Sequence, residues 1–274
     1  MDFGINPSYF TRSIASEEPS SLETAIDLCV RHGLCALLMP ARLSEARAEA
    51  LGAYVAQRGA YVHQTHLPYY RYAKDVDYGE VKRSFLACAE RSHTLGAQTL
   101  VVHIDEFDFK ATDYTCERAA DFNRRLLTPV VDYAVENGMR VAFENVFVDM
   151  GLPRFGSQTE ELLAFTESFG CDAVGICWDF GHAKMQYPDT YVAAFDAVAD
   201  WVIATHLHDN YYGKDLHVAP FLGNTDWAPL MEICKSKASG VPLTLELVYG
   251  TLPQALHESY AAFLYKGCAA LAGM

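Results

Sequence analysis

The sequence predicts an α/β fold of the (β/α)8 barrel class, in which a closed parallel sheet of eight strands is surrounded by helices. Three observations favour this class. Short apolar runs rich in β-branched residues alternate with longer amphipathic stretches along the 274 residues. Glycine repeatedly ends a helical pattern just before a strand. Eight such strand–helix units favour a barrel over an open doubly wound sheet, and the length is ordinary for one barrel.

We expect a single domain over residues 1–274, because no linker, low-complexity segment or long charge run divides the chain. The predicted strands lie near residues 2–6, 34–39, 60–66, 98–104, 139–145, 173–179, 202–207 and 242–247. The glycines that end helical patterns are Gly33, Gly59, Gly96, Gly138, Gly170 and Gly240.

Helical spacing is clearest near the two ends of the chain. The apolar positions of the first and the last helix are Leu22, Ile26, Cys29 and Val30, and Leu256, Tyr260, Phe263, Leu264 and Leu271. The segments SSLE at 20–23 and SQTE at 157–160 have the form of capping boxes, so we expect helices to start there.

Composition and charge exclude some classes of function. Hydrophobic residues make up 51% of the chain, which suffices for a large core, and the net charge of −14 argues against nonspecific binding to nucleic acid or anionic membranes. Eight cysteines without a CxxC pair are typical of reduced core residues. The start, MDFGINPSYF, lacks a basic segment followed by an apolar one, and no run approaches a membrane span. We therefore expect a cytoplasmic protein.

Metal-competent side chains recur where the predicted strands end. The carboxyl ends of all strands in a barrel face one mouth, where substrates bind. Six of these side chains follow the third to the eighth strand in order: His66, His103, Glu144, Asp179, His206 and Glu246. Three more follow shortly after strand ends: His182, Asp215 and His217. We expect these groups to converge at the mouth.

Taken singly, each of these residues has an ordinary structural explanation. A lone histidine is more often a hydrogen-bonded core or rim residue than a ligand, and each glutamate could pair with an arginine. Repetition at six successive strand ends is harder to explain this way, because buried charges normally pair or coordinate a metal. We interpret four other histidines as structural, since they lie on helices or away from strand ends: His32, His63, His93 and His257. Side chains of a strand point alternately inward and outward, so only one of the two histidines in THLHDN easily points into the barrel. Whether His208 and Asp209 belong to the site therefore stays open.

The mixture of donors indicates the kind of metal. Carboxylates combined with imidazoles suit Mn²⁺, Zn²⁺, Co²⁺, Fe²⁺ or Ni²⁺ better than Ca²⁺, and the absence of thiolate ligands argues against a purely structural zinc. A water-accessible site at a barrel mouth favours catalysis.

Eight motifs in strand order carry a resemblance to a known family. They are THLPY (65–69), VVH (101–103), FENV (143–146), WDFGHA (178–183), THLHDN (205–210), DLH (215–217), LGNTDW (222–227) and LTLEL (243–247). Together they resemble the xylose-isomerase-like TIM barrel superfamily, over nearly the whole chain. That superfamily contains sugar and sugar-phosphate isomerases and epimerases, inosose dehydratase and the endonuclease IV group.

The resemblance implies roles by position. In the ketose 3-epimerase branch, one divalent ion is held by groups that correspond to Glu144, Asp179, His206 and Glu246, and the two glutamates also act as acid and base. His182 resembles a substrate contact of that branch. In the endonuclease IV branch the same four look like ligands of a three-metal cluster, together with His66, His103, His182, Asp215 and His217.

We expect a metal-dependent isomerase or epimerase of a monosaccharide or related polyol, working by proton transfer through an enediolate. Its expected substrate-binding residues are His66, His103, His182, Lys214 and His217. Lys214 stands where the epimerase branch usually has an arginine. No glycine-rich phosphate cradle is evident, so an unphosphorylated sugar is favoured, and a homo-oligomer is possible.

Three alternatives stay open: a dehydratase or other lyase, a metal-dependent phosphodiester hydrolase of the endonuclease IV type, and a non-catalytic sugar-binding module. The hydrolase would need basic loops that follow the phosphates of a duplex. The loop PARLSEARAE alternates charge, and YYRYAK (69–74) is the one basic-aromatic cluster near the mouth, where it could equally stack on a sugar.

Overall fold

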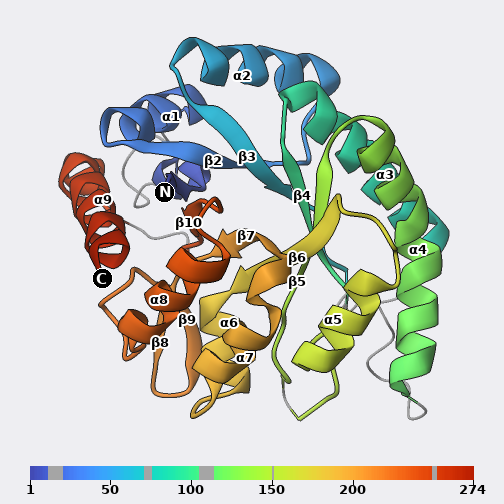
Figure 1. The fold of residues 1–274 in the computed structure, drawn as a ribbon. Helices are drawn as coiled ribbons and strands as arrows, with labels where there is room; N and C mark the ends of the chain where they lie inside the picture. The colour runs from blue at the N-terminus through green and yellow to red at the C-terminus, as the bar shows by residue number, and fades with distance from the viewer. Residues whose placement is uncertain (12–20, 71–75, 105–113, 150, 249–251) are drawn as a thin grey trace.

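The computed structural model confirms the predicted barrel and describes residues 1–11, 21–70, 76–104, 114–149, 151–248 and 252–274 (Figure 1). Eight parallel strands lie in the order β10-β1-β2-β3-β4-β5-β6-β7. Their bounds are β1 Phe3–Ile5, β2 Leu34–Pro40, β3 Tyr61–His66, β4 Thr99–His103, β5 Arg140–Glu144, β6 Val174–Asp179, β7 Val202–His206 and β10 Leu243–Leu245. Each strand overlaps its predicted stretch.

Helices cover the outside of the barrel (Figure 1). They are α1 Leu22–Arg31, α2 Glu45–Gln57, α3 Tyr78–Leu95, α4 Cys116–Glu136, α5 Thr159–Glu167, α6 Phe180–Gln186, α7 Tyr191–Val198, α8 Trp227–Lys237 and α9 His257–Gly273. Short 3-10 turns are η1 Pro7–Phe10, η2 Ala199–Trp201 and η3 Gln254–Leu256. Two helices, α6 and α7, follow β6.

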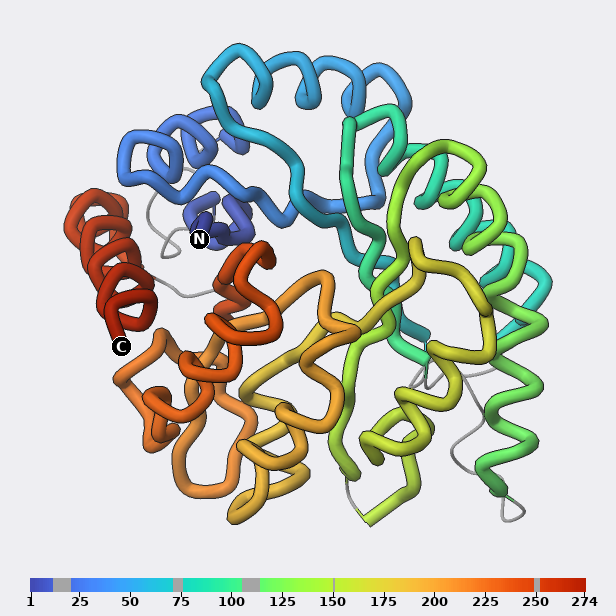
Figure 2. The backbone as a smooth tube through the Cα atoms, viewed as in Figure 1, coloured from blue at the N-terminus to red at the C-terminus, as the bar shows by residue number. Residues whose placement is uncertain are grey.

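The two ends of the sequence close the barrel. Figure 2 shows the backbone passing around the barrel from the blue N-terminal strand to the red C-terminal segment. β1 pairs with both β2 and β10, whereas β7 meets β10 through one bridge between Leu207 and Leu245. The Leu207 N–H donates to the Thr244 carbonyl at 2.7 Å, and the Glu246 N–H donates to the Leu207 carbonyl at 3.1 Å. These bonds fix the strand end that carries Glu246.

The register of the sheet brings the candidate side chains to one height. His103 on β4 is the register partner of Glu144 on β5, and Asp179 on β6 is the partner of His206 on β7. Since neighbouring strands lie about 4.8 Å apart, register partners on the same face are close neighbours. The sheet therefore places these four residues in one layer at the mouth.

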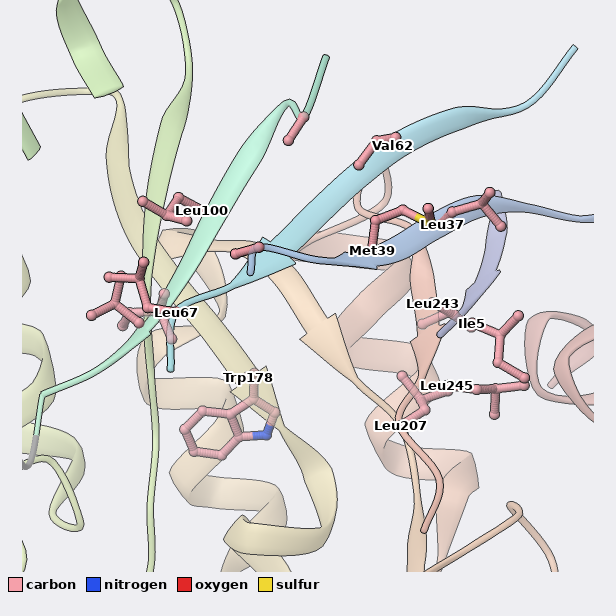
Figure 3. Close-up of a cluster of buried hydrophobic side chains, with 14 of the residues drawn as sticks. Ile5, Leu37, Met39, Val62, Leu67, Leu100, Trp178, Leu207, Leu243 and Leu245 are labelled. Atoms are coloured by element: carbon pink, nitrogen blue, oxygen red, sulfur yellow. The ribbon is translucent and has the colours of Figure 1, made fainter. Parts of the chain in front are cut away.

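Two hydrophobic clusters hold the barrel. The larger fills the space between strands and helices, and Figure 3 shows part of it, with Ile5, Leu37 and Leu243 from three adjacent strands. The smaller cluster is formed by Val101, Ala142, Cys177, Ile203 and Ala204, on strands β4 to β7. Its members are mostly small, which leaves room above them for buried polar groups.

An antiparallel hairpin of β8 (Asp209–Tyr211) and β9 (Lys214–Val218) follows β7 and was not predicted. Both strands are short and polar, so they carry little of the apolar alternation that identifies a strand from sequence. Gly213, with a φ of +62°, lies in the turn. The hairpin brings Asp215 and His217 back to the mouth.

Both helices start within the predicted capping segments, but the details of capping and one predicted helix end differ. The N-cap of α1 is Ser21, whose hydroxyl accepts from the Thr24 N–H, and residue 20 of the predicted box lies outside the described residues. The N-cap of α5 is Gln158, which makes no side-chain cap bond, and Glu160 of the predicted box accepts from the Thr159 hydroxyl at 3.2 Å. Five of the six predicted glycines have positive φ; Gly240 does not, since α8 ends earlier at Lys237.

Two apolar residues of the last predicted helix do not face the core. Leu256 ends the turn η3 before α9 starts, and Phe263 lies on the outer face of α9; both are exposed. All eight cysteines, each within the described residues, are free. None of the helices formed by the described residues is long and apolar enough to cross a membrane.

The close approach of β1 to β2 predicts a strong effect of a side chain at Gly4. A Cβ at this position would lie 1.8 Å from the Ala36 carbonyl oxygen on β2. Gly4→Ala should therefore force β1 away from β2 and lower the free energy of unfolding by about 3 kcal/mol, measured by urea denaturation. Gly240→Ala is the control, because its Cβ would meet no described atom within 4 Å. Equal stability of the two variants would contradict this packing.

Candidate metal centre

A cavity of about 670 Å³ opens at the carboxyl ends of the strands, which is the size typical of small-molecule sites. Seven of the predicted site residues line it: His66, His103, Glu144, His182, Asp215, His217 and Glu246. Asp179 and His206 are fully buried and lie against Glu144 beneath this lining. The structure therefore brings nine of the ten predicted residues together.

The predicted primary donor set is compact. The Nδ1 atom of His206 lies 3.2 Å from Glu144 Oε1, 3.3 Å from Glu246 Oε2 and 4.0 Å from Asp179 Oδ2. One donor atom from each of the four residues lies within 4.8 Å of the others. Ligands bonded at about 2.0–2.2 Å to one ion are separated by distances of this order. The geometry fits a single divalent cation.

The His206 ring gives a second test of this fit. Both ring nitrogens are buried and have no hydrogen-bond partner among the described residues, although Nδ1 faces three carboxylates. A buried polar atom without a partner costs free energy. A cation between Nδ1 and the carboxylates would satisfy the nitrogen and neutralise the carboxylates together.

Asp179 is fixed by its own strand end and by its neighbour Asn145. The Asn145 side chain accepts from the Asp179 N–H at 2.6 Å and donates to the Asp179 carbonyl at 2.9 Å. Asp179 is also the N-cap of α6, where its Oδ1 accepts from the His182 N–H at 2.6 Å. Helix α6 therefore starts at the strand end, which explains why Asp179 and His182 share one small volume.

A second group adjoins the first on the β3–β4 side. His66 Nε2 lies 2.8 Å and His103 Nε2 lies 3.2 Å from the same oxygen, Oε2 of Glu144. The Nδ1–H of His66 donates to the Leu67 carbonyl at 2.7 Å. In the metal-free site Nε2–H of His66 donates to Glu144. Once that proton leaves, Nε2 presents its lone pair to the site while Nδ1–H stays bound to a carbonyl, which is the arrangement usual for a ligating histidine.

A third group lies on the hairpin side and consists of His182, His208, Asp215 and His217, with donor atoms within 4.8 Å of one another. The Nδ1–H of His182 donates to the Asn145 carbonyl at 3.0 Å, and that of His217 donates to the Glu246 carbonyl at 3.1 Å. Their Nε2 atoms lie 3.8 Å and 3.2 Å from Asp215 Oδ2. These rings are therefore also held with Nε2 toward a carboxylate.

Opposite charges offset the cost of burial in the metal-free site. Burial raises the pKa of Glu144 and Asp179, but neighbouring histidines hold each pKa below its ordinary value: His206 and His103 for Glu144, His182 and His208 for Asp179. Burial lowers the pKa of His66 and His182, but nearby carboxylates raise it by more. Glu144 has this effect on His66, and Asp179 has it on His182.

The resulting pKa values are high for imidazoles. The pKa of His182 is raised to about 10 and that of His217 to about 9, while that of His206 lies well above 6.5, with Cys177 and Glu246 as its largest raising causes. In the metal-free site, protons on these rings therefore neutralise the carboxylates, as metal cations would.

The tenth predicted residue does not join the cavity. Lys214 begins β9, is exposed, and lies outside the described lining. The four histidines interpreted as structural also lie away from that lining. His32 pairs with Glu258 at 2.7 Å, His257 Nε2 donates to the Leu252 carbonyl, His93 lies exposed on α3, and His63 is buried in β3.

Sequence reasoning missed several groups at the mouth: Asn6, Phe147, Asp149 and Arg154 also line the cavity. Arg42 and Tyr69, from the quoted segments PARLSEARAE and YYRYAK, line it too, whereas residues 71–74 of YYRYAK lie outside the described residues. Arg154 is buried and donates to the Phe147 carbonyl at 3.3 Å. Most of these residues come from loops, where neither strand ends nor helical spacing gives a signal. Asn145 lay inside the quoted FENV motif, but its hold on Asp179 is visible only in three dimensions.

Asp209, left open from the sequence, is structural. Its carboxylate accepts from the N–H groups of Asn210, Phe221 and Thr225, from the Thr225 hydroxyl and from the Trp227 indole. It therefore anchors the loop between the hairpin and α8. His208, also left open, lies at the site, 3.0 Å from Asp179.

Residues 22–266 match the family described as xylose isomerase-like TIM barrel. The chain belongs to this family. A curated relative, the uncharacterized protein y4fM of Sinorhizobium fredii (strain NBRC 101917 / NGR234), is 28% identical over 158 residues, which are 56% of this chain and 48% of the relative. The match thus spans about half the length of that relative.

Solved structures share the fold of this family member. A D-psicose 3-epimerase structure in the presence of D-fructose has a TM-score of 0.79 at 13% identity, over 100% of both chains. An IOLI protein with a bound zinc atom has a TM-score of 0.75 at 16% identity, over 100% of this chain and 98% of that one. At such identities the likeness shows the fold alone.

The raised pKa values predict that cations and protons compete. Binding of Mn²⁺ should release protons, because His206 must lose its proton before Nδ1 can ligate. Affinity should therefore rise with pH between 6 and 8, by up to about tenfold per pH unit for each proton released. Calorimetry in two buffers of different ionisation enthalpy measures both quantities. An affinity independent of pH, without proton release, would show that Nδ1 is not a ligand.

Proposed function

We propose that the chain is a divalent-metal-dependent isomerase or epimerase of a monosaccharide or related polyol. The observation that carries this proposal is the position of two glutamates from different strands. Glu144 at the end of β5 and Glu246 after β10 lie 3.2 Å and 3.3 Å from the same nitrogen of His206. Both glutamates line the cavity, so a sugar bound in it would face carboxylates from two different strands.

The two glutamates have different surroundings, which suits different tasks. The Glu144 side chain is 1% exposed and faces His66, His103 and His206, whereas the Glu246 side chain is 26% exposed and lines the cavity. Glu246 can therefore exchange a proton with solvent between turnovers. We assign removal of the substrate proton to one glutamate and its return on the other face of an enediolate to the second.

A bound cation would supply Lewis acidity, which makes the C–H beside a carbonyl easier to deprotonate. Glu144, Asp179, His206 and Glu246 would hold it. Mn²⁺, Zn²⁺, Co²⁺, Fe²⁺ and Ni²⁺ suit these donors. The zinc atom bound to the IOLI protein of the same fold supports a metal in this chain.

The remaining groups are proposed to bind the sugar. His66, His103, His182 and His217 line the cavity and can donate to hydroxyl groups. Lys214 on the hairpin is assigned to a part of the substrate that projects in that direction. The D-psicose 3-epimerase of the same fold supports a sugar as substrate. We further propose an unphosphorylated sugar, a cytoplasmic protein without nucleic-acid or membrane partners, and a homo-oligomer.

A phosphodiester hydrolase is the second candidate. The observation that favours it is the tautomer pattern of His66, His182 and His217, whose Nδ1 atoms are bound to backbone carbonyls. This pattern leaves three Nε2 atoms directed at carboxylates beside the primary set, which would suit additional ions. The net charge of −14 counts against a nucleic-acid substrate.

Deuterium incorporation tests the proton transfer. For a sugar that the protein converts, drawn from a panel of ketoses and aldoses, turnover in deuterium oxide should place deuterium at the reacting carbon, measured by NMR. Glu246→Gln should slow turnover about 10²–10⁴-fold, with metal content measured in parallel because Glu246 is also a proposed ligand. Glu232→Gln on α8 is an exposed control that should leave turnover unchanged.

Two results would reject this function. Product without solvent deuterium over many turnovers would indicate hydride transfer or a fully shielded proton. Cleavage of an oligonucleotide at an abasic site, with no conversion of any sugar in the panel, would favour the hydrolase.

A further inference from the structure

His208 belongs to the third group and also contacts Asp179 of the primary donor set, yet the proposed reaction gives it no role. The residue follows β7, is 0% exposed, and is two positions beyond His206. Its Nε2 lies 3.0 Å from Asp179 Oδ1 and 3.1 Å from Asp179 Oδ2. One imidazole nitrogen therefore contacts both oxygens of a proposed metal ligand.

The same ring is stacked on His217. The two ring centroids are 3.7 Å apart and the planes are inclined by 11°. His217 is itself held by the Glu246 carbonyl and faces Asp215. The His208 ring thus contacts Asp179 at its edge and His217 on its face.

The sequence makes room for this ring at Gly181. A Cβ on Gly181 would lie 1.9 Å from His208 Cε1 and 2.4 Å from His208 Nε2. The His208 ring therefore occupies the space that any side chain at position 181 would need. This contact explains the glycine that separates Asp179 from His182.

The partners of the two nitrogens indicate the role of the ring. His208 Nδ1 is buried and has no hydrogen-bond partner among the described residues. An ionised carboxylate only accepts hydrogen bonds, so the ring nitrogen that faces Asp179 must be the donor. The proton of the neutral ring is therefore expected on Nε2, where it donates to Asp179.

We propose that His208 is a positioning residue. Its Nε2–H orients the Asp179 carboxylate and the face of its ring orients His217, so the ring links the primary donor set to the third group. Position 181 is a glycine because the ring occupies the space of a side chain there. This inference rests on the metal site of the proposed function. It does not depend on the sugar reaction. Asp179 then receives bonds from His208 and from the His182 N–H, and Oδ2 keeps a lone pair toward His206.

A double-mutant cycle on the metal-free full-length chain tests the contact itself. Gly181→Ala should lower the midpoint of urea unfolding in the wild-type background, because the methyl group displaces the ring. In a His208→Ala background the same change should have a much smaller effect, since the clash is gone. Equal effects in both backgrounds would overturn the placement of His208 over Gly181.

Binding of Co²⁺, followed by titration and by its visible absorption spectrum, tests the positioning role. His208→Ala should weaken binding by about 10–100-fold, as is usual for the loss of a group that orients a ligand, and should alter the spectrum. His208→Gln should restore most of the affinity and the wild-type spectrum, because its amide N–H can donate to Asp179. His257→Gln, at a buried histidine outside the cavity lining, is the control and should bind as the wild type does.

Two outcomes would refute the positioning role. Wild-type binding by His208→Ala would show that Asp179 does not need the ring. Loss of one equivalent of Co²⁺ from His208→Gln, with the primary site intact, would show that His208 is a ligand. If the wild type binds no Co²⁺ at all, the metal site of the proposed function fails, while the unfolding cycle still decides where the ring lies.

Discussion

The mouth of the barrel depends on the burial of Glu144. Its carboxylate is almost completely removed from water and lies within 3.4 Å of imidazole nitrogens from four histidines on four elements: His66, His103, His182 and His206. An isolated buried carboxylate costs several kcal/mol, and it is tolerated when positive charge or a metal compensates. In the metal-free protein protonated imidazoles supply that charge. The same arrangement accepts a cation when the protons leave.

Other features of the chain position groups around this carboxylate. The parallel register sets His103 beside Glu144 and His206 beside Asp179. Asn145 fixes the backbone of Asp179, and helix α6 begins there so that His182 returns to the same volume. The hairpin after β7 adds Asp215 and His217, with Asp209 anchoring the loop that follows. Residues distant in sequence therefore act on one small site.

Much of this arrangement could be predicted from sequence, because a barrel repeats one simple rule. A strand end in a parallel barrel always faces the mouth, so an acid or histidine at that position can be placed without knowing any contact. That rule located Glu144, Asp179, His206 and Glu246. It could not locate Arg154 or Asn145, whose positions depend on the path of a loop and on a side-chain hydrogen bond. It also missed the hairpin that carries Lys214 away from the cavity, since short polar strands leave little periodic signal.

The proposed function requires that the buried charges at the mouth form a site for a divalent cation. Anomalous diffraction from crystals soaked in Mn²⁺ tests this site independently of any substrate. A peak is expected within bonding distance of His206 Nδ1 and of carboxylate oxygens of Glu144, Asp179 and Glu246. A structure without a peak there, in which His206 Nδ1 donates a hydrogen bond to one of these carboxylates at millimolar Mn²⁺ and neutral pH, would contradict it.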